Sequence, residues 1–107
     1  MPTQPRLAFL ENLVNEGKAD SFARYALALE YDRLARSSES LAAFEALRRD
    51  DPSYLPMYLM AAKLLRRLDQ GQRATEWVHA GIALAESTGN GHAKSELLDF
   101  LEELSAS

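Results

Sequence analysis

Residues 21–52 read SFARYALALEYDRLARSSESLAAFEALRRDDP, and the rest of the chain is arranged around this stretch. Its apolar and small residues recur every three or four positions, which is the spacing of one face of an amphipathic helix. The pattern is interrupted at Ser37 and Ser38 and stops before Pro52, because a residue that precedes proline is pushed out of the helical region. The stretch therefore predicts two helices joined by a short turn.

Residues 54–85, YLPMYLMAAKLLRRLDQGQRATEWVHAGIALA, repeat this design with few identities. The chemical types return one 34-residue period later. Small residues at such positions allow neighbouring helices to approach each other closely. The three pairs one period apart are Ala28 and Ala62, Leu34 and Leu68, and Ser40 and Ala74.

The spacing in the first stretch resembles the tetratricopeptide repeat, whose pattern is W-x2-L-G-x2-Y, then A-x3-F, then P. Arg24 stands in place of the tryptophan, and this is the one real departure, because small residues replace small ones elsewhere. The resemblance implies a small stand-alone bacterial tetratricopeptide protein with an all-α fold, a right-handed stack of antiparallel helix pairs with about six helices. The matching residues are Leu27, Ala28, Tyr31, Ser40, Phe44 and Pro52.

We expect a single domain over residues 1–107, in which a capping helix covers each end of the two repeats. The last helix has an apolar face made of Ala93, Leu97, Phe100, Leu101 and Leu104, and its opposite side carries Lys94, Glu96, Glu102 and Glu103. The expected parts are an N-terminal capping helix over 5–16, repeat 1 over 21–52, repeat 2 over 54–86 and a C-terminal capping helix over 91–104.

Turn and cap residues mark the ends of these helices. Glycine tolerates the left-handed backbone that often ends a helix, and aspartate tolerates it better than most residues. Serine and aspartate side chains accept hydrogen bonds from the free N–H groups of a first helical turn. The expected left-handed ends are Gly17 and Asp69, and the expected N-caps are Asp20 or Ser21 for one helix and Ser37 or Ser38 for the next.

The composition of the 107 residues excludes several classes of function. The chain has no cysteine, which excludes disulfides, thiolate metal sites and cysteine nucleophiles. Its formal net charge of −4 argues against nucleic-acid binding, because no overall basic field gathers phosphates. The N-terminal stretch has neither the charge pattern nor the apolar length of a signal peptide or a membrane span. We expect a cytoplasmic protein without a membrane partner or a cofactor.

Candidate catalytic groups are scarce. His79 and His92 are thirteen residues apart and lack a third ligand at a suitable spacing, whereas a metal site needs three or four converging donors. Glu102 and Glu103 are adjacent on a helix, so their side chains point about 100° apart and do not share one substrate atom. No nucleophile elbow or phosphate-binding glycine loop is present. The sequence predicts no metal site and no enzyme.

The resemblance implies a binding groove lined by the first helix of each pair. Aromatic and aliphatic side chains alternate there with cations, which would suit a peptide or protein segment with acidic groups. The competing interpretation is an ordinary solvated face with incidental apolar residues. Carried over by position, the groove residues are Tyr25, Leu29, Asp32 and Arg33 from the first repeat, with Phe22 beside them, and Leu59, Lys63, Arg66 and Arg67 from the second.

Some members of the family hold a terminal carboxylate with a clamp of lysine and asparagine on these helices. Tyr25, Leu29 and Met60 occupy three of the clamp positions here. The sequence therefore lacks this clamp.

Trp77 raises an alternative function. With Ala80 and Leu84 it forms a second apolar stripe on its helix. We expect it to pack against the last helix around residues 97–101, and the alternative is an exposed anchor for a partner or for a second copy of the chain. In that alternative the protein is a self-associating homodimer that uses its terminal helices or the Trp77 stripe. Light scattering distinguishes this homodimer from a module that binds a partner in its groove.

Overall fold

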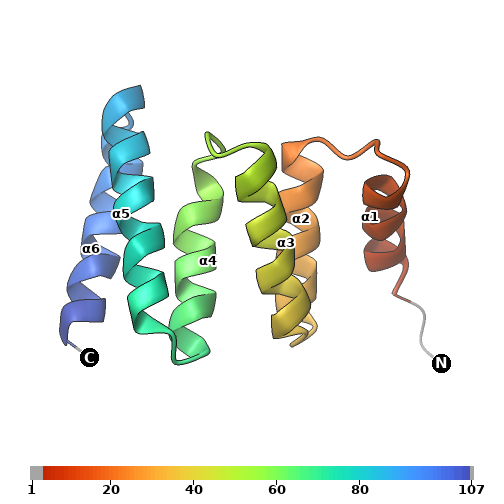
Figure 1. Ribbon diagram of the computed structural model, residues 1–107, viewed down its shortest axis with the longest axis horizontal. Helices are drawn as coiled ribbons and strands as arrows, with labels where there is room; N and C mark the ends of the chain where they lie inside the picture. The colour runs from red at the N-terminus through yellow and green to blue at the C-terminus, as the bar shows by residue number, and fades with distance from the viewer. Residues whose placement is uncertain (1–3, 107) are drawn as a thin grey trace. The chain divides into compact units, whose positions relative to one another are not determined.

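The computed structural model describes residues 4–106, which form six helices (Figure 1). The chain consists of two compact units that divide between Pro52 and Ser53. The number of helices agrees with the prediction. In the first unit they are α1 (Pro5–Asn15), α2 (Ser21–Arg33) and α3 (Ser37–Asp50); in the second unit they are α4 (Pro56–Arg67), α5 (Gly71–Thr88) and α6 (Gly91–Ala106).

Helices α2 and α3 form the antiparallel pair of the first unit. The Asp20 side chain caps α2 by accepting a hydrogen bond from the backbone N–H of Ala23 at 2.8 Å. Ala28 and Ser40 are fully buried, and the Ser40 hydroxyl donates to the Ala28 carbonyl at 2.7 Å. This bond ties α3 to α2, and it satisfies the buried hydroxyl of Ser40, which stands where the family pattern has alanine. The small residues therefore serve the close packing that was predicted for them.

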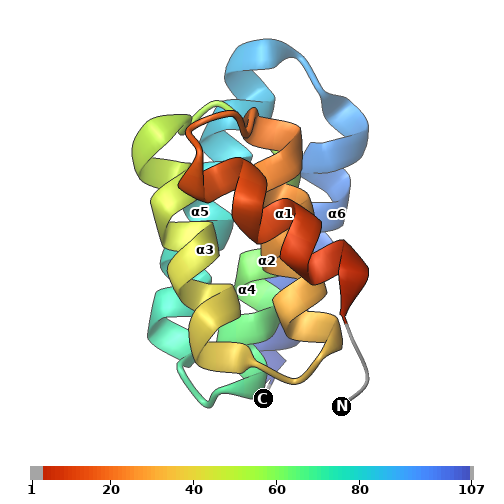
Figure 2. The same cartoon turned by 90° about the vertical axis from the view of Figure 1, so that its right-hand side faces the viewer.

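Helix α1 runs obliquely across α2 (Figure 2). Leu7 and Leu10 are buried against Leu27 and form a small apolar cluster of their own. A polar contact lies beside it, because the Tyr31 hydroxyl donates to the Glu11 carboxylate at 2.5 Å. Burial, assisted by this hydrogen bond, raises the pKa of Tyr31 to about 12. Both kinds of contact fix α1 on α2.

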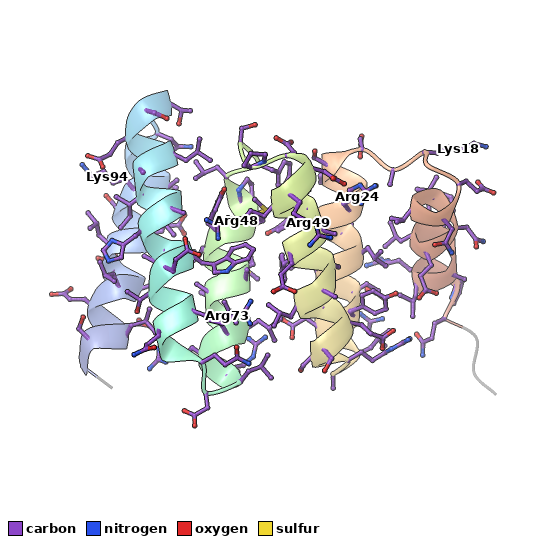
Figure 3. All side chains as sticks on the ribbon, viewed as in Figure 1. Lys18, Arg24, Arg48, Arg49, Arg73 and Lys94 are labelled. Atoms are coloured by element: carbon purple, nitrogen blue, oxygen red, sulfur yellow. The ribbon has the colours of Figure 1, made fainter. Side chains whose placement is uncertain are left out.

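Ion pairs also connect elements of the first unit. Arg24 of α2, labelled in Figure 3, lies 3.3 Å from the Asp50 carboxylate of α3. The Ser21 hydroxyl donates to Asp51 at 2.6 Å, so the start of α2 is held to the end of α3. These contacts close the helix pair at its open end.

In the second unit, α4 packs against both α5 and α6. Tyr58 lies against Trp77 of α5, with 5.8 Å between the ring centroids. Gly81 of α5 marks the closest crossing, because a Cβ atom built there would stand 2.8 Å from Cβ of Tyr58 and 3.0 Å from Cδ1 of Leu97. The buried residues of α4 are Met57, Tyr58, Ala61, Ala62, Leu64 and Leu65.

Four helices end in the same way, with one residue in the left-handed conformation. The next residue then donates its N–H to a carbonyl five positions earlier, which satisfies a group that the helix leaves unpaired. Gly17 and Asp69 adopt this conformation, as predicted, with φ of +70° and +62°. Gly89 and Ala35 adopt it too, and Ala35 was not anticipated.

One local prediction and one alternative were wrong. Neither Ser37 nor Ser38 caps α3, because Ser37 is already its first residue and Arg36 occupies the cap position without a side-chain cap bond. Trp77 is only 4% exposed, so it is not a surface anchor, and the ring that it contacts is Tyr58 of α4. The alternative of an exposed anchor is therefore wrong, and the expected packing of Trp77 against the last helix stays a prediction.

Candidate functional site

The residues predicted on α4 border two adjoining hollows in the second unit. One hollow of about 250 Å³ is lined by Leu59 and Lys63 of α4 together with residues of α6. A second of about 420 Å³ shares Lys63 and Phe100 with the first. We refer to both together as the α4–α6 groove, lined by Leu59, Lys63, Arg66, Arg67, Glu96, Asp99, Phe100 and Glu103.

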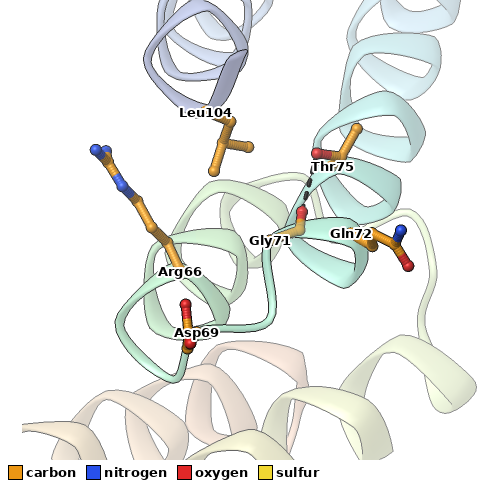
Figure 4. A pocket seen from close by; sticks show the side chains of 6 residues that line it. All are labelled: Arg66, Asp69, Gly71, Gln72, Thr75 and Leu104. Carbon is orange, nitrogen blue, oxygen red and sulfur yellow. Dashed lines mark hydrogen bonds between the residues drawn. The ribbon is translucent and has the colours of Figure 1, made fainter. Parts of the chain in front are cut away.

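A third hollow of about 480 Å³ lies beside the turn between α4 and α5. Its lining includes Arg66, which it shares with the groove, and Leu104 near the end of α6 (Figure 4). The Thr75 hydroxyl at its edge donates to the Gly71 carbonyl at 2.9 Å, so this group is occupied by its own helix. The hollow therefore extends the apolar and polar surface around Arg66 without presenting a reactive group.

Arg66 joins the two walls of the groove. Its guanidinium donates to the Glu103 carboxylate at 3.2 Å and lies over the Phe100 ring, 5.7 Å from the centroid. Lys63 and Asp99 line the same hollow but make no hydrogen bond or ion pair with any residue of the described range 4–106. In the groove, Arg66 is thus already paired, whereas Lys63 and Asp99 are two opposite charges that are left to solvent or a ligand.

The predicted residues on α2 belong to the first unit and share one face of that helix by their spacing. The Tyr25 ring packs edge-on against Phe44 at 6.4 Å, while Leu29 and Asp32 are half-buried. The Arg33 guanidinium donates to the Glu30 carboxylate from Nε at 3.0 Å and from Nη2 at 2.5 Å. Much of this set is therefore engaged by its own unit.

Glu30 is the buried partner of Arg33, with only 4% of its surface exposed. The Arg33 hydrogen bonds hold the pKa of the Glu30 carboxyl below its ordinary value against the opposing effect of burial, and Arg6, 3.9 Å away, adds to the lowering. The same pair raises the pKa of Arg33. Both groups stay charged near neutral pH, so Arg33 presents to a ligand a cation that is already compensated.

Helix α6 supplies half of the groove, which the sequence analysis missed. Glu96 and Glu103 were assigned to a solvated opposite side, but they line a hollow that faces α4. Asp99 and Phe100 lie on the same stripe, because positions 96, 99, 100 and 103 follow the i, i+3, i+4, i+7 spacing. This spacing was the available signal, although only the packing shows which neighbour the stripe meets.

The described part of the chain gives no indication of metal or membrane chemistry. Within residues 4–106, no three His, Asp or Glu side chains converge as a metal site would require. His92 lies 3.5 Å from Glu96, a pair that is charged on both sides only when the histidine is protonated. None of the six helices is long and apolar enough to cross a membrane.

Comparison with solved structures places the chain among known proteins. A tetratricopeptide repeat domain protein of Salinibacter ruber, solved in solution, is 38% identical, and the match covers 79% of this chain and 86% of that one with a TM-score of 0.77. A crystal structure of such a domain from the same organism is 36% identical over 82% of this chain and 98% of that one, also with a TM-score of 0.77. The chain belongs to the tetratricopeptide repeat family.

The family membership confirms the predicted all-α, tetratricopeptide-like fold and the resemblance to small bacterial members. A protein of Bordetella parapertussis shares the fold at 24% identity, with a TM-score of 0.81 over 99% of this chain and 90% of that one. No protein-family profile and no curated protein matches the chain.

Proposed function

We propose that this tetratricopeptide protein is an interaction module without chemistry of its own, which binds a segment of another protein in the α4–α6 groove. The predicted α2 residues, Tyr25, Leu29, Asp32 and Arg33, are proposed as a further contact surface for the same role. The interaction role is supported by the tetratricopeptide relatives of known structure. A soluble, cytoplasmic setting without nucleic acid is part of this proposal.

One observation carries the proposal: the groove combines an apolar floor with charged groups that have no internal partner. Phe100 and Leu59 form the floor, and Lys63 and Asp99 stand beside it without an ion pair among residues 4–106. Peptide-binding grooves use apolar anchors for affinity and rim charges for orientation. The residues of the groove have the chemistry of such a site.

The test uses a random peptide library selected on the immobilised chain, followed by affinity measurement with the selected peptides. Lys63→Glu reverses a groove charge that has no partner to lose, so we expect binding to weaken by about tenfold, the effect of losing one exposed charge contact and gaining a repulsion. Arg49→Glu is the matched control, since Arg49 is an exposed residue of α3 that lines neither hollow and its replacement makes the same change of charge. Unchanged affinity in Lys63→Glu would contradict the proposal.

Self-association is the second candidate, favoured by exposed apolar residues on the terminal helices. Phe9 of α1 is 62% exposed and Leu98 of α6 is 44% exposed. The Trp77 route receives no support, because that side chain is buried. Light scattering over a range of concentrations tests this candidate: a dimer that dissociates in the double variant Phe9→Ser, Leu98→Ser supports it, and a monomer at all concentrations contradicts it.

A further inference from the structure

The two hollows of the α4–α6 groove differ in charge. The smaller one is lined by three carboxylates, those of Glu96, Asp99 and Glu103, and by one cation, Lys63. The larger one is lined by three cations, Lys63, Arg66 and Arg67, and by no carboxylate. The hollows meet at Lys63 and Phe100, so the groove changes sign across a shared apolar floor.

The internal contacts leave one charge of each sign available. Arg66 is held by Glu103 and by the Phe100 ring, which fixes it between the two walls. Lys63 and Asp99 have no hydrogen-bond or ion-pair partner within residues 4–106, although both border the smaller hollow. A ligand that binds here therefore finds a cation and an anion in one hollow, together with the apolar side chains of Leu59 and Phe100.

A segment of a single charge would fit this groove poorly. A wholly acidic segment would bring its carboxylates against Glu96 and Asp99, and a wholly basic one would bring its cations against Arg66 and Arg67. Like charges placed together oppose binding, and complementary charges select the partner and its orientation. The acidic segment expected from α4 alone is thus disfavoured once α6 is part of the site.

We infer that the bound segment is of mixed charge: an apolar side chain on Phe100 and Leu59, an acidic side chain toward Lys63, and a basic side chain toward Asp99 and Glu96. This inference rests on the proposed function and adds the chemical class of the partner. It also assigns specificity to α6, because the carboxylates of Glu96, Asp99 and Glu103 oppose the binding of wholly acidic segments.

The experiment measures the affinity of four synthetic peptides that have the same length and the same apolar centre. One is acidic on both sides of the centre, one is basic on both sides, and two carry one charge on each side in opposite orders. We expect one of the two mixed-charge peptides to bind about tenfold more tightly than the acidic and the basic peptides, since each exposed charge contact contributes a factor of about two to five.

Two variants test whether the carboxylates of α6 cause the preference for a mixed-charge peptide. Asp99→Lys should remove the preference for mixed charge and make the acidic peptide the tightest ligand. Glu102→Lys makes the same change at an exposed position of α6 that lines neither hollow, so it should leave the order of the four peptides unchanged.

The outcomes separate this inference from the proposed function. The inference is overturned if the acidic or the basic peptide binds the wild-type chain most tightly, or if Asp99→Lys does not alter the order of the four peptides. In either case, a loss of affinity for library peptides in Lys63→Glu still supports the proposed function. Failure of all four peptides, with library peptides still sensitive to Lys63→Glu, overturns the inference as well. If library peptides are also insensitive to Lys63→Glu, both fail.

Discussion

At the scale of single residues, Ala35 occupies a position where its backbone conformation is unfavourable. Its φ is +60°, a region that costs residues with a Cβ atom about 1–2 kcal/mol relative to a right-handed one. Asp69 occupies the equivalent end of α4, and glycine occupies the ends of α1 and α5. The hydrogen bond from Arg36 to the Tyr31 carbonyl at 2.8 Å holds Ala35 in this conformation.

Ala35→Gly should therefore stabilise the protein. We expect a gain of about 0.5–1 kcal/mol in the free energy of unfolding, since relief of the left-handed strain exceeds the additional entropy of glycine in the unfolded chain. Urea denaturation followed by circular dichroism measures it. Ala42→Gly, at an exposed helical position of α3, is the control and should lose about 1 kcal/mol instead. A loss of stability in both variants would contradict this explanation of the turn.

The carboxyl group of Glu30 makes the stability of the folded chain depend on pH. Its pKa in the folded state lies below the ordinary value of 4.5, mainly because of the Arg33 hydrogen bonds. A carboxyl with a depressed pKa contributes stability above its unfolded pKa, and this contribution disappears as the pH falls through the folded value. Stability derived from Glu30 is therefore present at pH 7 and is lost below about pH 4.5.

Glu30→Gln should remove this pH-dependent part. We expect the variant to be less stable than wild type at neutral pH, and the difference in unfolding free energy between the two proteins to shrink as the pH falls toward about 3. Urea denaturation at a series of pH values measures this difference. A difference that stays constant from neutral to acidic pH would show that the carboxylate is not stabilised by its charge.

At the scale of helices, Gly81 sets how closely α5 approaches its neighbours. A methyl group there would stand 2.8 Å from Cβ of Tyr58 and 3.0 Å from Leu97. Cβ of Tyr58 is attached directly to the α4 backbone, so it cannot move aside without shifting that helix. The position therefore couples three helices through the absence of a side chain.

Gly81→Ala should destabilise the second unit in spite of the higher helix propensity of alanine. Overpacking typically costs about 1–3 kcal/mol, against a propensity gain of about 1 kcal/mol, so we expect a net loss of up to about 2 kcal/mol. Gly71→Ala is the control, because a Cβ at that position meets no atom within 4 Å. Thermal melting of both variants measures the effect, and equal melting temperatures would contradict the close crossing.

The helices themselves could be predicted from the sequence, because each has a clear apolar period and a clear breaker. Gly17, Pro52 and the residues around Gly89 end helices for local reasons that a sequence displays. The start of α3 could not be predicted in this way. Serine is a good cap, but α3 already begins at Ser37, so Arg36 occupies the cap position.

Half of the candidate groove could also be predicted. The α4 residues Lys63 and Arg66 follow from the family pattern, whereas Asp99 and Phe100 of α6 do not. The last helix matches no repeat position closely, and its sequence gives two possible faces without stating which one α4 covers. Only packing against α4 and α5 resolves this, because α6 must bury Leu97 and Phe100 and thereby turns Asp99 toward the groove.

At the scale of the whole molecule, the chain consists of two helical units, of which the second contains a groove whose charge changes sign. The first unit contributes a surface on α2 whose cation Arg33 is compensated by Glu30. The second unit keeps Lys63 and Asp99 without partners within residues 4–106. We therefore expect recognition to depend mainly on α4 and α6.

The most direct test is an NMR titration of the labelled protein with the tighter of the two mixed-charge peptides. We expect saturable shifts of backbone amides over residues 59–67 of α4 and 96–103 of α6, with smaller changes on α3 and on the outer side of α5. Shifts that are largest on α3 or α5, or that do not saturate, would contradict the assignment of binding to the α4–α6 groove.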